Sequence, residues 1–305
     1  MAESDPASTT ATQGRTIVSL LPWAGPAFVI GWWVHDLSFH WASLVEYRFG
    51  WMAFILAGFL AWERWPTRPA PMSPEVPRPV LAITLLGLAG FAIVLFAELY
   101  RIGVMRAPSQ VFPLSVGCAC FIGAHLLVIG GWPFAKHFLF PLLFFFVAVP
   151  LPNLFWQPVV LGLQDLVAVL NVEALEIMGI PAVREGHVIQ LPKTRVGVDE
   201  ACSGIRSLQS TLMAAMFIGD LTLRRWRTRV ALLVAGVALA IIGNWGRSLY
   251  LSLTAHRGGS DSLNAVHDSA GWTVLVFTAG GIAVLSWIMS KLDNRMNASA
   301  APESP

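Results

Sequence analysis

Long apolar runs constrain the fold of this chain more than any other feature of its sequence. A helix of about 20 apolar residues crosses the ~30 Å core of a bilayer, where backbone groups find partners only within the helix. Only 12% of the residues are charged, about half the share in soluble domains. We therefore predict an all-α polytopic membrane protein with about eight transmembrane helices, at residues 16–34, 43–62, 80–100, 110–131, 137–151, 203–221, 230–253 and 271–290.

The positions of the basic residues predict the orientation. Short loops rich in Lys and Arg stay in the cytoplasm, and the strongest is 224–229, with four arginines in six residues. Counting spans outward from this loop places the 64–78 loop, Lys136 and the tail with Lys291 and Arg295 inside as well. We expect a multi-pass protein of the inner membrane with both termini in the cytoplasm.

The same pattern predicts one integral membrane domain, residues 16–292. A polar head, 1–15, and a tail rich in Ala, Ser and Pro, 293–305, are expected to be disordered and cytoplasmic. The outside then receives the loops 35–48, 101–109 and 254–270 and the long extracytoplasmic segment 152–202.

The segment 152–202 is expected to be structured in two parts. Residues 154–178 mix apolar residues at helical spacing with Gln, Asp, Asn and Glu, which is typical of an amphipathic helix lying in the outer interface. A ninth span there would break the agreement among the basic loops. Residues 183–191 and 194–198 alternate apolar and polar side chains, which predicts a small β-hairpin that leads toward Cys202.

Three side chains suited to thiol chemistry stand at the outer mouths of three different spans. Cys202 precedes the sixth span, where the exposed N–H groups of a helix start favour a thiolate, and Arg206 would strengthen this effect. Arg247 lies deep in the seventh span, where a charge is costly and usually functional, with Asn244 one turn below it. His267 lies at the mouth of the eighth span.

Together these groups fit acyl transfer through sulfur. Such chemistry needs a nucleophilic thiolate, an imidazole base and a donor such as a guanidinium that stabilises an oxyanion. Each residue also has a plainer interpretation: Cys202 as a buried structural cysteine, Arg247 as an arginine reaching to the interface, and His267 as a solvated loop residue. Cys118 and Cys120, two apart in an apolar run, are interpreted as small buried residues.

Other kinds of site find little support in the sequence. His256, Asp261, His267 and Asp268 flank one loop without compact ligand spacing, and no Cys-x-x-Cys is present, so we expect neither a metal nor another cofactor. The net charge is +2 and the basic residues follow topology, so no nucleic-acid partner is expected.

At these residues the sequence resembles the exosortase/archaeosortase family of polytopic membrane enzymes. The resemblance covers roughly residues 150–290, and the first five spans match only as hydrophobic segments. The matching pieces are the run Ala-Cys-Ser-Gly-Ile-Arg-Ser at 201–207, the pair Asn244-x-x-Arg247, His267 followed by Gly271, and the lead-in 179–198 with Arg184-x-Gly186.

The resemblance implies a role for each site residue. Cys202 would be the nucleophile, Arg247 would stabilise the oxyanion or the substrate, and His267 would act as general base and acid. The supporting residues would be Ser203, Arg206 and Asn244.

The resemblance also implies a function and its partners. The enzyme would be a cysteine peptidase or transpeptidase that cleaves the C-terminal sorting signal of exported proteins outside the membrane. That signal is a short motif, a hydrophobic helix and a basic cluster. The released acyl group would pass to an acceptor, or to water in a plain thiol peptidase.

Two other classes of function are weighed against this one. A component of polysaccharide export or transport, without cysteine chemistry, would line a route across the membrane with charges. Apart from Asp220 and Arg247, the spans hold few charges at depth, so this alternative ranks second. A non-catalytic scaffold predicts that Cys202→Ala leaves function intact.

Overall fold

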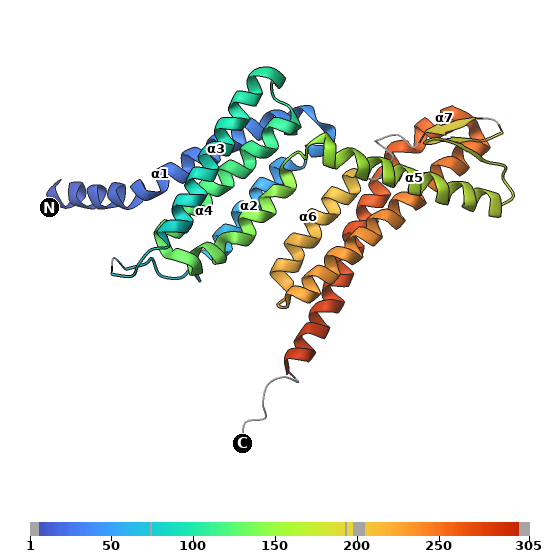
Figure 1. Ribbon diagram of the computed structural model, residues 1–305. Coiled ribbons are helices and arrows are strands. Elements are labelled where there is room, and N and C mark those ends of the chain that lie inside the picture. The colour runs from blue at the N-terminus through green and yellow to red at the C-terminus, as the bar shows by residue number, and fades with distance from the viewer. Residues whose placement is uncertain (1–5, 74, 193, 198–204, 299–305) are drawn as a thin grey trace. The chain divides into compact units, whose positions relative to one another are not determined.

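The chain forms helices and one small sheet, arranged in two compact units, Met1–Pro150 and Leu151–Pro305 (Figure 1). The structure is a computed structural model, and it describes residues 6–73, 75–192, 194–197 and 205–298. We describe each unit by itself. The prediction of one domain over residues 16–292 stays a prediction.

The first unit is a set of helices around α4. It contains α1 (Pro6–Ser43), α2 (Gly50–Arg64), α3 (Val80–Val104) and α4 (Pro108–Phe145), with short 3-10 turns at Val45–Tyr47 and Phe146–Ala148. Helix α1 takes in residues 6–15, for which the composition predicted disorder.

Two buried indoles attach α1 to the rest of the first unit. Trp33 Nε1 donates to Ser115 Oγ at 2.7 Å, and Trp41 Nε1 donates to the Ala148 carbonyl at 2.9 Å. A buried indole N–H needs such an acceptor, since leaving it unpaired would cost free energy.

Helix α4 is interrupted at Gly130 and Gly131, so the predicted spans 110–131 and 137–151 belong to its two halves. Gly131 has φ +64°, a conformation that glycine adopts without a steric penalty. A Cβ at Gly131 would also stand 2.6 Å from Met72 Sδ, so the turn leaves no room for a side chain.

The second unit carries the candidate site residues. It contains α5 (Asn153–Ile177), β1 (Val183–Glu185), β2 (Val188–Gln190), β3 (Arg195–Gly197), α6 (Ile205–Thr222) and α7 (Trp226–Ala298). Helix α7 is broken at Gly259, whose φ is +72°, and we call residues 226–258 and 260–298 its first and second halves. The prediction of a loop at 254–270 is therefore wrong, because the segment is helical before and after Gly259.

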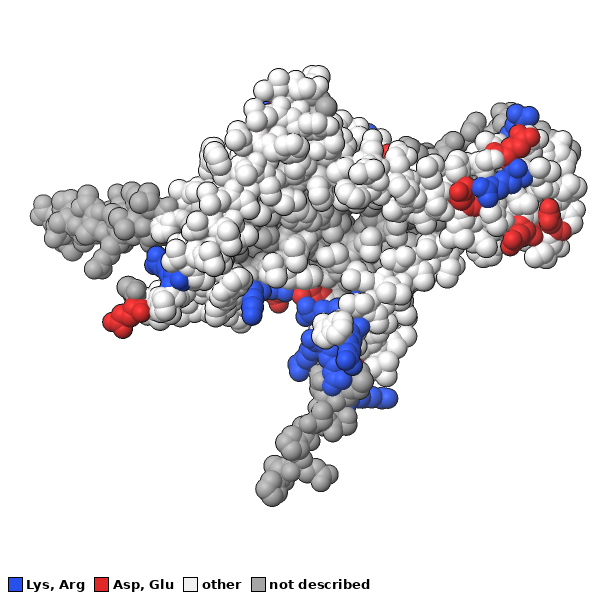
Figure 2. All heavy atoms as spheres, in the orientation of Figure 1, with Lys and Arg blue, Asp and Glu red and all other residues white. Residues whose placement is uncertain are grey.

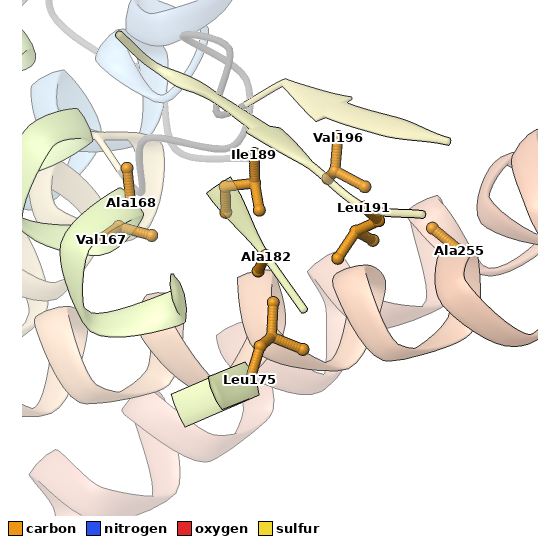
Figure 3. Packing of buried hydrophobic residues seen from close by; sticks show 8 residues of the cluster. All are labelled: Val167, Ala168, Leu175, Ala182, Ile189, Leu191, Val196 and Ala255. Carbon is orange, nitrogen blue, oxygen red and sulfur yellow. The ribbon is translucent and has the colours of Figure 1, made fainter. Parts of the chain in front are cut away.

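The three strands form an antiparallel sheet in the order β1-β2-β3, so the first predicted stretch, 183–191, is divided into two strands. The sheet packs on α5 and on the end of the first half of α7 through a buried apolar cluster (Figure 3). The cluster consists of Val167, Ala168, Leu175, Ala182, Ile189, Leu191, Val196 and Ala255. This packing fixes β3, which ends five residues before Cys202.

Within the described residues, five helical segments are long and apolar enough to cross a membrane. This confirms an all-α polytopic membrane protein but not a count of eight spans. Helix α2, with 15 residues, is shorter than the roughly 20 that a span needs. The five segments are Val80–Gly103, Pro108–Ala148, Asn153–Ile177, Trp226–Gly259 and Ser269–Arg295.

Helix α5 is one of these five, although the sequence predicted an interfacial helix there. Its length and composition alone suit a span. In Figure 1, however, α5 crosses α7 at an angle and does not run beside it along its length. Its buried face contacts α7 and the sheet.

Candidate active site

The described residues contain part of the predicted site. Cys202 and Ser203 lie outside them, between the end of β3 and the start of α6. Arg206 lies in the first turn of α6 and His267 in the second half of α7, but their side chains are not described. Side-chain positions are therefore described for Arg247 and Asn244 only.

Arg247 lies against the helical turn that follows His267. It is half-buried on the first half of α7, and a Cβ built on Gly271 would stand 3.7 Å from Arg247 Nη2 and 3.9 Å from Cζ. Gly271 is one helical turn after His267 on the same helix. The guanidinium therefore lies close to the turn that carries His267.

The two halves of α7 pack antiparallel, and their register places the backbone of His267. A Cβ on Gly281 would meet Leu239, and one on Gly243 would meet Phe277, at 2.8 and 3.3 Å. At this register the Arg247 side chain lies level with Gly271. His267 precedes Gly271 by four residues, so its backbone lies about 6 Å from Gly271 along the helix axis, toward Gly259. The backbones that carry the predicted base and the predicted cation are thus one turn apart.

Helix α6 also packs antiparallel to the first half of α7. A Cβ on Gly236 would stand 3.4 Å from Thr211 Cγ2 and 3.5 Å from Ala215 Cβ. Because the two helices run in opposite directions, the start of α6 lies beside a later part of α7. The first turn of α6 is therefore level with the turn that carries Asn244 and Arg247. That first turn begins three residues after Cys202.

The opposite end of this helix packing is fixed by a carboxylate. Asp293 accepts hydrogen bonds from the backbone N–H groups of Arg224 and Arg225, at 2.9 and 3.2 Å. Asp220 pairs with Arg229 across the same turn. Figure 2 shows Lys and Arg gathered at this end of the second unit, whereas basic and acidic residues are mixed at the other end. The unit therefore has two charged ends, and the end with the 224–229 turn is the more basic one.

The structure explains the Arg184-x-Gly186 pattern in the segment that precedes the site, which the sequence alone did not. Gly186, with φ +62°, makes the turn between β1 and β2. Arg184 donates from Nε to the Gly186 carbonyl at 2.8 Å and from Nη2 to Asp165 of α5. Arg184-x-Gly186 therefore attaches the sheet to α5.

Sequence reasoning missed a buried contact next to Arg247. Asn171 Nδ2 on α5 donates to Ser248 Oγ on α7 at 2.6 Å, and both side chains are buried. Gln164, seven residues before Asn171 and on the same face, is buried as well. Gln164 and Asn171, two turns apart on one face, were the available signal, but we had interpreted the polar residues of this segment as the polar face of an amphipathic interfacial helix.

Three further residues were singled out in the sequence: Asn244, Cys118 and Cys120. Asn244 is buried, and its Nδ2 has no hydrogen-bond partner within the part of the chain that is described. Its predicted role in orienting Arg247 stays a prediction. Cys118 is buried and Cys120 half-buried in α4, as predicted for small residues of an apolar helix. No cluster of three or more His, Cys, Asp or Glu among the described residues could hold a metal ion.

The fold and these residues define a multi-pass helical membrane protein with a polar site at one end of a packed helix group. The family pattern of the transmembrane exosortases matches residues 41–284, which is most of the chain. The chain belongs to the transmembrane exosortase family. The match begins well before residue 150, so it includes much of the first unit, which the sequence had related to the family only as hydrophobic segments. No curated protein and no solved structure matches the chain.

Family membership gives the coarse function. Transmembrane exosortases are membrane transpeptidases of protein sorting, and they act on exported proteins that carry sorting signals. The residues that perform the reaction in this chain are a separate question.

Proposed function

We propose that this protein is a cysteine transpeptidase that cleaves C-terminal sorting signals on the outer face of the inner membrane and transfers the exported protein to an acceptor. Cys202 is the nucleophile, Arg247 the oxyanion donor, and His267 the general base and acid. The observation that supports the proposal is that three backbone segments lie at the same level along the helix axes. They are the start of α6, the turn with Arg247, and the turn between His267 and Gly271.

The proposed reaction has two steps. The Cys202 thiolate attacks the scissile carbonyl carbon, Arg247 stabilises the negative oxygen, and His267 gives a proton to the departing amine. The products are a thioester on Cys202 and a free hydrophobic tail. The acceptor nucleophile then loses its proton to His267 and attacks the thioester, and the thiolate leaves.

Three supporting residues act on the nucleophile and its cation. The N–H groups at the start of α6, together with Arg206 and Ser203, favour the thiolate form. Asn244 lies one turn from Arg247 on the same face and limits where its side chain can go.

The charge distribution of the second unit supports the orientation. Basic loops stay in the cytoplasm, and the 224–229 turn lies at the end of α6 and α7 opposite the level of Arg247. With this turn inside, the site lies at the outer interface. A tail with one membrane helix and a cytoplasmic basic cluster would place its scissile motif at the same depth.

The angle of α5 across α7 also supports this arrangement. An amphipathic helix in the outer interface would lie across the ends of transmembrane helices and cover the site from one side. Asn171 and the cluster of Figure 3 hold α5 there.

The test is single substitution with a matched cysteine control, measured by processing of a co-expressed protein that carries a sorting tail. Cys202→Ser and Arg247→Ala should abolish processing while the protein stays in the membrane. Cys120→Ser, in α4, should process normally. Mass spectrometry of the product distinguishes transfer, which adds the acceptor mass, from hydrolysis, which leaves a free carboxylate. A fully active Cys202→Ser variant would refute the proposal.

A further inference from the structure

The first unit contains a large apolar cavity that the proposed reaction does not use. Helices α1, α2 and α4 enclose about 590 Å³ there, within the range of ligand pockets. Its walls are aliphatic and aromatic side chains, including Trp23, Ala57, Trp65 and Phe138. Trp62, another lining residue, is 71% exposed, so the cavity reaches the surface of the unit. In a helical membrane protein, such an opening admits hydrocarbon more readily than water.

One histidine in the lining has a ring nitrogen without a hydrogen-bond partner among the described residues. His125 is the single ionisable residue among those that line the cavity, and Trp23 contacts its ring edge-on. His125 Nε2 is buried and has no hydrogen-bond partner in the described part of the chain. A pure hydrocarbon would leave this nitrogen unpaired, whereas an ester or hydroxyl oxygen of a lipid gives it a partner.

Arg68 contacts one lining residue of the cavity, Trp65, and Arg64 directly precedes that residue in the sequence. Arg68 Cζ lies 4.4 Å above the ring of Trp65, itself a lining residue, and Nη1 donates to the Trp65 carbonyl at 2.7 Å. Arg64 Cζ lies 5.3 Å above the ring of Phe140. The exposed Arg68 guanidinium has five N–H groups, so it can also bind an anion.

We propose that the first unit binds one anionic phospholipid, with an acyl chain in the cavity and the phosphate at Arg68 and Arg64. The apolar walls select a chain, and the two arginines select a negative headgroup. The 64–78 loop is predicted to be cytoplasmic, and Lys and Arg next to that leaflet attract anionic lipid. This proposal is independent of the cysteine chemistry.

The first test compares two arginines of one loop. Protein stripped of lipid in mild detergent is mixed with phosphatidylglycerol or phosphatidylcholine, and bound lipid is counted by native mass spectrometry. Wild type should retain one phosphatidylglycerol and bind it about tenfold more tightly than phosphatidylcholine. Arg68→Ala should remove most of this preference, since a hydrogen bond to a charged group contributes about tenfold or more to binding. Arg78→Ala removes another exposed arginine of the loop, ten residues from Arg68, and should bind like wild type.

The second test fills the cavity. Gly58 lines it, and a Cβ on Gly58 would meet nothing within 4 Å, so the position is open and Gly58→Leu should place a side chain in the lipid's space. Gly87, on α3, is equally open but is not a lining residue, so Gly87→Leu is the matched control. Gly58→Leu should lose bound phosphatidylglycerol with an unchanged melting temperature in detergent, and Gly87→Leu should keep it.

Two results would overturn the proposal. Equal binding of both lipids by wild type would show that the arginines select no headgroup. Retention of phosphatidylglycerol by both Arg68→Ala and Gly58→Leu would show that the lipid binds elsewhere.

Discussion

The guanidinium of Arg247 lies against Gly271, and its Nη2 would stand 3.7 Å from an ideal Cβ on that glycine. That distance is ordinary van der Waals contact, so an alanine fits. We expect a larger side chain at 271 to press on the guanidinium of the proposed oxyanion donor.

Substitution at Gly271 should therefore depend on size. Gly271→Ala should keep processing within about twofold, whereas Gly271→Leu should displace the guanidinium. Removal of one oxyanion donor typically lowers turnover by about 10²–10³. Processing rates and melting temperatures of both variants check this. Normal processing by a folded Gly271→Leu protein would argue against a catalytic Arg247.

The buried Asn171 to Ser248 hydrogen bond should stabilise α5 on α7. Asn171→Ala and Ser248→Ala should each lower the free energy of unfolding by about 1–2 kcal/mol, because each leaves a buried polar partner without its bond. The double variant should cost clearly less than the sum, since both changes remove one interaction. Thermal unfolding in detergent measures all three proteins, and strict additivity would show that the two groups do not interact.

Asp36 neutralises two arginines in the first unit. Its buried Oδ1 lies 3.3 Å from Arg101 Nη1 and 3.5 Å from Arg106 Nε. Asp36→Ala should destabilise the protein by about 2 kcal/mol, less than for a fully buried pair because both arginines are partly exposed. Glu98→Gln, which alters a half-buried i,i+3 pair with the same Arg101, should change stability by less than about 0.5 kcal/mol. Similar losses in both variants would contradict this assignment.

His40 should make stability depend on pH. It lies outside the five candidate spans, and burial lowers its pKa, an effect that Asp36 partly opposes and Arg106 reinforces. The unfolded chain then binds a proton below about pH 6.5 while the folded chain does not. Stability is therefore full above that pH and falls as the pH drops toward the lowered folded pKa. The melting temperature should fall between pH 7.5 and 5.5, and His40→Gln should flatten this fall.

Much of the helical architecture could be predicted from the sequence, because only helices and closed barrels satisfy their backbone hydrogen bonds in lipid. Residues 80–100 and 230–253 are long, mainly apolar runs, and both are helical. The strands at 183–191 alternate as a two-sided sheet requires. The break at Gly259 was not predictable to the residue, since the 254–270 segment contains no proline and can be helical on both sides.

The candidate site residues were predicted from their chemistry, whereas the contacts around them were not. Cys202, Arg247 and His267 are reactive residue types near the ends of predicted spans, and their catalytic roles stay a prediction. Asn171 is one of several polar residues on α5, and only the packing shows that it faces Ser248. The closeness of Arg247 to Gly271 likewise follows from the register of two helices, which a sequence does not specify.

The most direct test of the account is the proximity of residues 202 and 267. In a Cys118→Ser, Cys120→Ser background, His267→Cys should form a disulfide with Cys202 under mild oxidation, detected as a cross-linked peptide by mass spectrometry. Thr273→Cys, exposed on the same half of α7, should not. A cross-link at 267 alone is the predicted result. Its absence from folded protein, or equal cross-linking at 273, would contradict a shared pocket for the thiol and the imidazole.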